Sequence, residues 1–168
     1  DFEPWPLADR AKAALKALTL GETVTLAYGG RPVDRYDRRL AHVFLSDGTW
    51  VQGVMLARGL ARVYTFRDNR KLAQTMYHLE DAARGGGRGI WAAPFYQVRA
   101  PPELAELIDT FQVVEARVED VAEVNGRVYI NFGRNWREDF TVTLPPDVRR
   151  LFEAEGIDPE IYDDHVVQ

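Results

Sequence analysis

The sequence predicts an α+β protein, mainly β, that is divided into two parts. Apolar residues recur at helical spacing in residues 7–18 and 72–83, whereas several shorter segments alternate like strands. Two dipeptides, Asp47-Gly48 and Asn125-Gly126, are strong signals for tight hairpin turns. The segment Arg99-Ala100-Pro101-Pro102 lies where the composition becomes acidic, which is typical of a linker. With 168 residues, the chain is long enough for one medium domain or two small ones.

In the first part, the order of predicted elements is helix, two strands, short helix, strand and long helix. The first helix covers residues 7–18, and Gly21 is placed to end it. The strands are predicted at residues 23–28, 40–45 and 60–66, and the short helix at 52–58. Asp68 or Asn69 is expected to cap the long helix, which continues to about residue 83.

The glycine-rich stretch at residues 85–89 has two readings. It lacks the lysine and serine of a phosphate-binding loop. We therefore expect it to end the long helix and to let Trp91 fold back onto the core. Glu80 and Asp81 are adjacent on that helix, so they point in different directions and are expected to be solvated surface rather than a catalytic pair.

The second part is predicted to be a small β module. A long alternating strand at residues 111–124 leads through the Asn125-Gly126 turn to a partner strand at 127–132. A third strand is predicted at 140–144 and a helix at 146–155. The last four residues, 165–168, begin a strand that has no room to finish, so we expect the sequence to be a fragment of a longer protein.

The formal net charge of -5 conceals two halves of opposite sign. Residues 1–99 hold 15 Lys and Arg against 10 Asp and Glu, a balance of +5, whereas residues 100–168 hold 6 against 16, a balance of -10. The first half would attract an anionic partner such as nucleic acid, and the second would repel it. Two solvated surfaces of opposite sign would produce the same balance.

The composition excludes several classes of protein. No cysteine is present, so a disulfide framework and a thiolate zinc site are excluded. No run approaches the ~18 uncharged apolar residues of a membrane span. The first ten residues show no basic-then-apolar signal peptide, and the compartment stays open.

Four short motifs, in order, resemble the staphylococcal nuclease (thermonuclease) family. The most informative is Asp34-Arg35-Tyr36-Asp37-Arg38, followed at once by Leu40-Ala41-His42-Val43-Phe44. Gly59-Leu60-Ala61-Arg62-Val63-Tyr64 and Gly89-Ile90-Trp91 come later in the correct order, and the resemblance covers roughly residues 7 to 93. It implies a five-stranded OB-type barrel packed against helices. It also implies calcium-dependent hydrolysis of DNA or RNA phosphodiester bonds, and it favours an exported or periplasmic location.

The resemblance also implies site residues. The last arginine of the Asp-Arg-Tyr-Gly-Arg motif, which reaches the scissile phosphate in this family, corresponds to Arg38. A planar guanidinium suits this role because it can donate two hydrogen bonds to phosphate oxygens that gain charge. Arg35, Tyr36 and Tyr64 stand at motif positions near the nucleotide pocket and are the expected substrate-binding residues. Packing within a half-buried barrel is an equally good role for each tyrosine.

The sequence departs from the family pattern in two ways. Asp37 replaces the usual glycine of the motif, and we expect it to adopt the left-handed conformation that aspartate tolerates. Its charge beside Arg38 is unfavourable unless it pairs with Arg35 or Arg39 or helps a metal. The family's Arg-Leu-x-Gly-Ile-Asp-x-Pro-Glu signature is absent from residues 1–33, so we expect no calcium ligands, no metal site and no general base in this chain.

Two hypotheses on function follow. In the first, the full-length protein is a nuclease-type phosphodiesterase, and this chain holds one half of its site. In the second, the protein is a degenerate nuclease fold that only binds nucleic acid or protein. The predicted domains are residues 1–97 (nuclease-like, lacking its first strands), 98–110 (linker) and 111–168 (an incomplete second module). The stretch Val128-Tyr129-Ile130-Asn131-Phe132-Gly133, with Trp136 after it, resembles an OB-like module appended to some nuclease-family proteins. Its acidity favours a packing role or a protein partner over nucleic acid.

Overall fold

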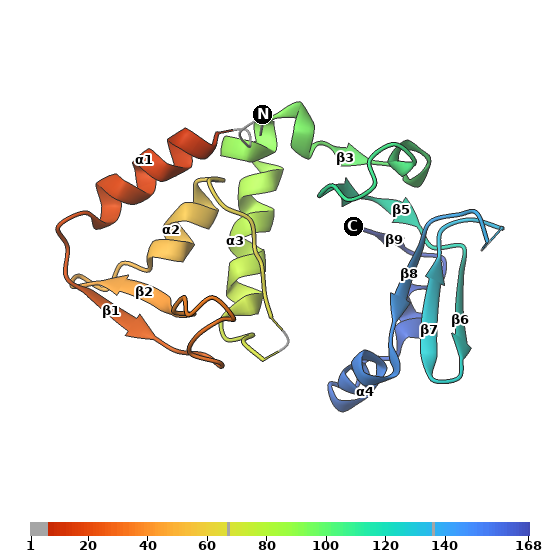
Figure 1. Ribbon diagram of the computed structural model, residues 1–168. Coiled ribbons are helices and arrows are strands. Elements are labelled where there is room, and N and C mark those ends of the chain that lie inside the picture. Colours follow the sequence, from red (N-terminus) through yellow and green to blue (C-terminus); the bar gives the residue numbers. More distant parts are fainter. Residues whose placement is uncertain (1–6, 67, 136) are drawn as a thin grey trace. The chain divides into compact units, whose positions relative to one another are not determined.

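The chain folds into two units. The structure is a computed structural model that describes residues 7–66, 68–135 and 137–168 (Figure 1). The first unit ends at Tyr96 and the second begins at Gln97. Trp136, which the sequence places in the second module, lies outside the described residues. Within the described part of the chain, no helix has the length and apolar character that crossing a membrane requires.

The first unit packs three helices with a two-stranded sheet. Its elements, in chain order, are α1 (Ala8–Thr19), β1 (Val24–Ala27), β2 (His42–Leu45), α2 (Val51–Ala57) and α3 (Ala73–Gly85), followed by two short 3-10 turns at Gly89–Ala92 and Pro94–Tyr96. β1 and β2 are antiparallel, in register from Val24 opposite Leu45 to Ala27 opposite His42. These elements confirm the predicted helices at 7–18, 52–58 and 72–83 and the predicted strands at 23–28 and 40–45.

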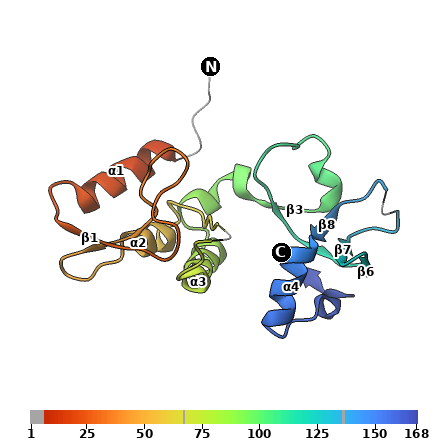
Figure 2. The same ribbon diagram turned by 60° about the horizontal axis from the view of Figure 1, so that its bottom comes forward.

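The short helix α2 is the centre of the first unit. It lies between α1 and α3 in both views and also packs against β2 (Figures 1 and 2). The buried apolar side chains come mostly from α2 and from the chain around α3 and its end: Val51, Met55, Leu56, Ala83, Ile90 and Trp91. Trp91 is only 8% exposed, so the glycine-rich stretch does return it to the core as the sequence predicts.

Two glycine backbones lie against each other where α2 and α3 end. Gly59 and Gly89 have left-handed φ angles of 64° and 56°, and the N–H of Ile90 donates to the carbonyl of Gly59 at 2.8 Å. A Cβ added to Gly89 would lie 2.1 Å from the carbonyl oxygen of Gly59. This close approach explains why two of the sequence motifs begin with glycine.

Residues 60–66, predicted as a strand, form none. Only an isolated bridge between Phe66 and Asn69 is found there. Strands need a partner, and the N–H of Val63 instead donates to the carboxylate of Glu80 on α3. The predicted cap of α3 is also wrong, because the helix begins at Ala73 after a left-handed Leu72 with no side-chain cap.

Glu80 is buried, at 9% exposure, contrary to the prediction of solvated surface. Its neighbour Asp81 is exposed and pairs with Arg84 at 2.8 Å. The two adjacent carboxylates therefore face different environments, as residues one position apart on a helix must.

The described residues of the second unit form several small sheets and one α-helix. A three-stranded antiparallel sheet consists of β6 (Asp120–Val124), β7 (Arg127–Asn131) and β8 (Thr141–Leu144). The remaining pairs are β3 (Val98–Arg99) with β4 (Val113–Val114), in parallel, and β5 (Ala116–Arg117) with β9 (Val166–Val167), antiparallel. The helix α4 (Pro146–Ala154) follows β8, and 3-10 turns lie at Pro101–Leu104 and Pro159–Tyr162.

The long strand predicted at 111–124 is broken into β4, β5 and β6. The reason is topological, because β4 pairs with β3, β5 with β9 and β6 with β7. The Asn125-Gly126 turn forms as predicted, with both residues at positive φ (52° and 75°). The core of this unit is built on Val118, Val128 and Ile130.

The fold class is mixed α+β. The four α-helices of the described residues hold more residues than their nine short strands. The described strands form two- and three-stranded sheets and no closed barrel.

Candidate functional site

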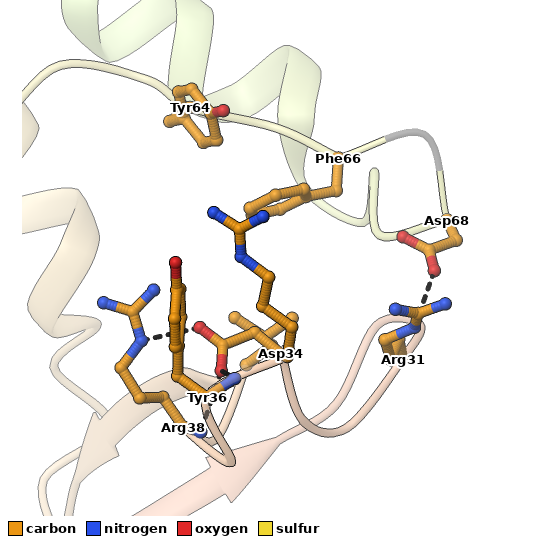
Figure 3. Close-up of a pocket in the computed structure, with 9 residues that line it drawn as sticks. Arg31, Asp34, Tyr36, Arg38, Tyr64, Phe66 and Asp68 are labelled. Atoms are coloured by element: carbon orange, nitrogen blue, oxygen red, sulfur yellow. Dashed lines mark hydrogen bonds and ion pairs between the residues drawn. The ribbon is translucent and has the colours of Figure 1, made fainter.

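The loop that connects β1 to β2 is organised by Asp34. Its Oδ1 accepts the N–H groups of Tyr36 (2.8 Å) and Arg38 (2.9 Å), which closes a tight turn. Its Oδ2 accepts Nε of Arg38 at 2.6 Å (Figure 3). One carboxylate thus shapes the turn and holds the guanidinium of Arg38.

Asp37 adopts the left-handed conformation that the sequence predicts, with φ 59°. The carboxylate that pairs with an arginine of the motif is, however, that of Asp34 and not that of Asp37. Among the described residues, Asp37 has no ion pair with Arg35 or Arg39.

The ring of Tyr36 lies beside two guanidinium groups. The Cζ atoms of Arg35 and Arg38 are 4.7 Å and 5.2 Å from the ring centroid. Such contacts are attractive because the ring face carries a negative quadrupole. The tyrosine is 63% exposed, so these contacts orient the two arginines without removing them from solvent.

An aromatic pair comes from the segment that leads to α3. Tyr64 and Phe66 make an edge-to-face contact, with ring centroids 5.1 Å apart (Figure 3). Tyr64 is 79% exposed, a large value for an aromatic ring. Beyond Phe66, Asp68 forms an ion pair of 3.1 Å with Arg31 of the β1–β2 loop, which joins the two segments.

The two segments together line a hollow of about 550 Å³. All four residues predicted from the sequence, Arg35, Tyr36, Arg38 and Tyr64, line it. Sequence reasoning missed the other polar and aromatic members: Arg31, Asp34, Phe66 and Asp68. Asp34 stands inside the predicted motif and Phe66 two residues after Tyr64, so both positions carried a signal. Arg31 and Asp68 are far apart in sequence and carried none.

Three arginines and two aspartates line the hollow, which is a formal balance of +1. Burial raises the pKa of Asp34, but the N–H groups of Arg38 and Tyr36 and the guanidinium of Arg38 outweigh it and hold that pKa below its usual range. Asp34 is therefore an ionised partner of Arg38. The side chain of Arg38 remains 72% exposed, so its outer nitrogens face solvent.

Carboxylates for a metal ion are not gathered here. No group of three or more His, Cys, Asp or Glu side chains that could hold a metal ion occurs among the described residues. The two carboxylates of the hollow, Asp34 and Asp68, are each held by an arginine. Calcium requires six to eight oxygen ligands, so this donor set does not fit it.

A family model described as staphylococcal nuclease homologue matches residues 3–93 of the chain. The chain belongs to the staphylococcal nuclease homologues. The match covers both walls of the hollow, and it confirms the resemblance seen in the sequence motifs. The second unit lies beyond the matched residues.

Two curated relatives support the same assignment for this nuclease homologue. An uncharacterized endonuclease from Escherichia coli O157:H7 is 36% identical over 78 residues, which are 46% of this chain and 48% of the relative. An uncharacterized endonuclease from Escherichia coli shows the same identity and coverage. The chain therefore spans about half the length of the curated relatives that it matches.

Proposed function

We propose that this chain carries the phosphate- and base-binding half of a nuclease site, and that its full-length form hydrolyses phosphodiester bonds of DNA or RNA. The observation that carries the proposal is the hollow in which Arg35, Arg38, Tyr36 and Tyr64 meet, inside the region that matches the staphylococcal nuclease homologues.

In this proposal, Arg38 binds the scissile phosphate. Its contact with Asp34 uses Nε, so the two outer nitrogens are the donors that can reach two phosphate oxygens. Phosphoryl transfer increases the charge on these oxygens, and a fixed guanidinium stabilises the transition state more than the ground state. Asp34 contributes by fixing the orientation of that guanidinium before substrate arrives.

Tyr64 and Phe66 supply a stacking surface in the same proposal. Exposed aromatic rings stack on nucleobases without strong preference for sequence. Arg35 and Arg31 add positive charge at the rim, which attracts the phosphate backbone. The arrangement suits a flexible single strand, whose bases are available for stacking.

The catalytic metal and the general base belong to the part of the proposal that concerns the full-length protein. The family resemblance implies calcium, but the described residues do not fit it, so no step of the mechanism is assigned to a metal here. Four further points are proposals in the same way. They are a closed five-stranded barrel, domain boundaries at 97 and 111, an exported location, and a protein partner for the acidic second module.

A second candidate is a degenerate nuclease fold that binds nucleic acid without cleaving it. This candidate requires only the arginines and aromatic rings of the hollow, which the chain contains. Both candidates require the hollow to bind a single strand, and they differ only in cleavage by the full-length protein.

Binding is tested on this chain with a fluorescein-labelled oligothymidine by fluorescence anisotropy. We expect affinity to fall as salt rises and to fall about tenfold in an Arg38→Ala variant, because a charged hydrogen-bonding group is lost. Arg10→Ala is the matched control, since it removes the same charge from an exposed position on α1. If both variants bind like the parent chain, the hollow is not the binding site.

Cleavage is tested on the full-length protein with calcium and single-stranded DNA. If the full-length protein is a nuclease, it should cleave the DNA, and the cleavage rate should fall about 10²- to 10³-fold in Arg38→Ala. Tight binding with intact DNA would support the degenerate fold instead.

A further inference from the structure

The segment that carries Tyr64 and Phe66 is held in place at a few separate points. It forms no strand with any other described segment. At its start, Gly59 accepts the N–H of Ile90, and the N–H of Leu60 donates to Met55 at 2.9 Å. At its end, Phe66 forms an isolated antiparallel bridge with Asn69. Between these points, the N–H of Val63 donates to the carboxylate of Glu80 on α3 at 2.5 Å.

Side-chain packing holds Tyr64 only weakly. Its ring is 79% exposed, and its ring contact is with Phe66, which belongs to the same segment. The place of the Tyr64 ring therefore depends on the backbone of the preceding residue, Val63.

Glu80 is suited to fix that backbone. It lies in the middle of α3, a helix of 13 residues, and it is 9% exposed. The charged groups that face it are Arg84 and Asp81 on α3 and Arg62 on the opposite segment. Burying a carboxylate is costly unless it accepts hydrogen bonds, and the N–H of Val63 provides one.

We infer that Glu80 is a positioning residue of the nucleic-acid site, which holds Tyr64 opposite the arginines of the β1–β2 loop by accepting the N–H of Val63. The inference rests on the proposed function, because it concerns how the stacking surface is placed. Glu80 itself lines none of the hollow around Arg38.

The test compares Glu80→Ala with Glu80→Gln in the full chain, by oligothymidine anisotropy at neutral pH. We expect about tenfold weaker binding in Glu80→Ala, because a hydrogen bond to a charged group is lost and the segment loosens. Glu80→Gln keeps an oxygen that can accept the same N–H, so it should restore binding to within about threefold of the parent chain. Asp81→Ala, which removes the exposed neighbouring carboxylate, is the matched control and should bind like the parent.

A second readout is independent of nucleic acid. Hydrogen exchange of the Val63 amide, which donates to Glu80, should accelerate in Glu80→Ala and remain slow in Glu80→Gln, while the amides of α2 keep their protection. Unchanged exchange in Glu80→Ala would overturn the inference.

The outcome also separates this inference from the proposed function. If Tyr64→Ala weakens binding while Glu80→Ala binds like the parent chain, the site is correct and the positioning role is wrong. If Tyr64→Ala and Arg38→Ala both bind like the parent chain, the proposed function itself fails, whatever the exchange shows.

Discussion

Substituting Gly89 by alanine should destabilise the first unit far more than substituting Gly87, two residues earlier. Both glycines are left-handed, with φ 58° at Gly87 and 56° at Gly89. A Cβ on Gly87 would meet no atom within 4 Å, whereas a Cβ on Gly89 would lie 2.1 Å from the oxygen and 2.6 Å from the carbon of the Gly59 carbonyl. The pair therefore separates backbone strain from steric conflict.

The magnitude follows from these two contributions. An alanine in the left-handed region costs about 1–2 kcal/mol, and this cost is common to both variants. At Gly89 the conflicting atoms are backbone, so the chain must shift, which costs about 1–3 kcal/mol. The shift also weakens the hydrogen bond from Ile90 to Gly59, worth about 1 kcal/mol. We expect Gly89→Ala to lower the free energy of unfolding by about 2–4 kcal/mol more than Gly87→Ala.

The assay is thermal unfolding, followed by the circular dichroism of the helices. One kcal/mol corresponds to about 4–8 °C in Tm for a unit of this size, so the two variants should differ by at least ~8 °C. Gly59→Ala should resemble Gly89→Ala, because its Cβ would lie 2.1 Å from the carbonyl oxygen of Arg88. Equal Tm values for Gly87→Ala and Gly89→Ala would refute the close approach of the two backbones.

Three further predictions concern a carboxylate of the hollow, the buried carboxylate of α3 and the second unit. Asp34→Asn should weaken oligothymidine binding about threefold to tenfold, because it removes the charge that orients Arg38. In the parent chain, the pKa of Asp34 is lowered, so its charge is lost only below the usual aspartate pKa of ~3.9. Binding by the parent chain should therefore persist until the pH falls below ~3.9. Burial raises the pKa of Glu80, so above ~4.3 the folded chain retains a proton that the unfolded chain releases. The free energy of unfolding measured in urea should therefore fall as the pH rises above ~4.3, and this decline should be absent in Glu80→Gln. An equal decline in the parent chain and in Glu80→Gln would contradict the raised pKa of Glu80. Val128→Ala should destabilise the second unit by about 2 kcal/mol with no change in oligothymidine binding, whereas Val124→Ala, at an exposed position, should change stability by less than ~0.5 kcal/mol.

Sequence patterns predict the helices and tight turns of the first unit and four of the residues that line the hollow. The helical period predicts α1, α2 and α3, because helix formation depends on apolar spacing within a few turns. Turn chemistry is equally local, and the left-handed conformations of Asp37 and of Asn125-Gly126 follow from the residue types. The hollow around Arg38 contains the motif residues because a tight loop keeps neighbours in sequence close in space.

Tertiary structure alone decided which strands form and which carboxylate is buried. Residues 60–66 alternate like a strand but have no neighbour to pair with, and residues 111–124 are divided because three different partners pair with them. Strand formation requires hydrogen bonds from a distant segment, so alternation within a strand does not decide it. Glu80 and Asp81 have similar side chains and adjacent positions, yet only Glu80 faces the segment of Val63. The burial of a charge depends on what packs against it, and that is fixed only when the whole unit is folded.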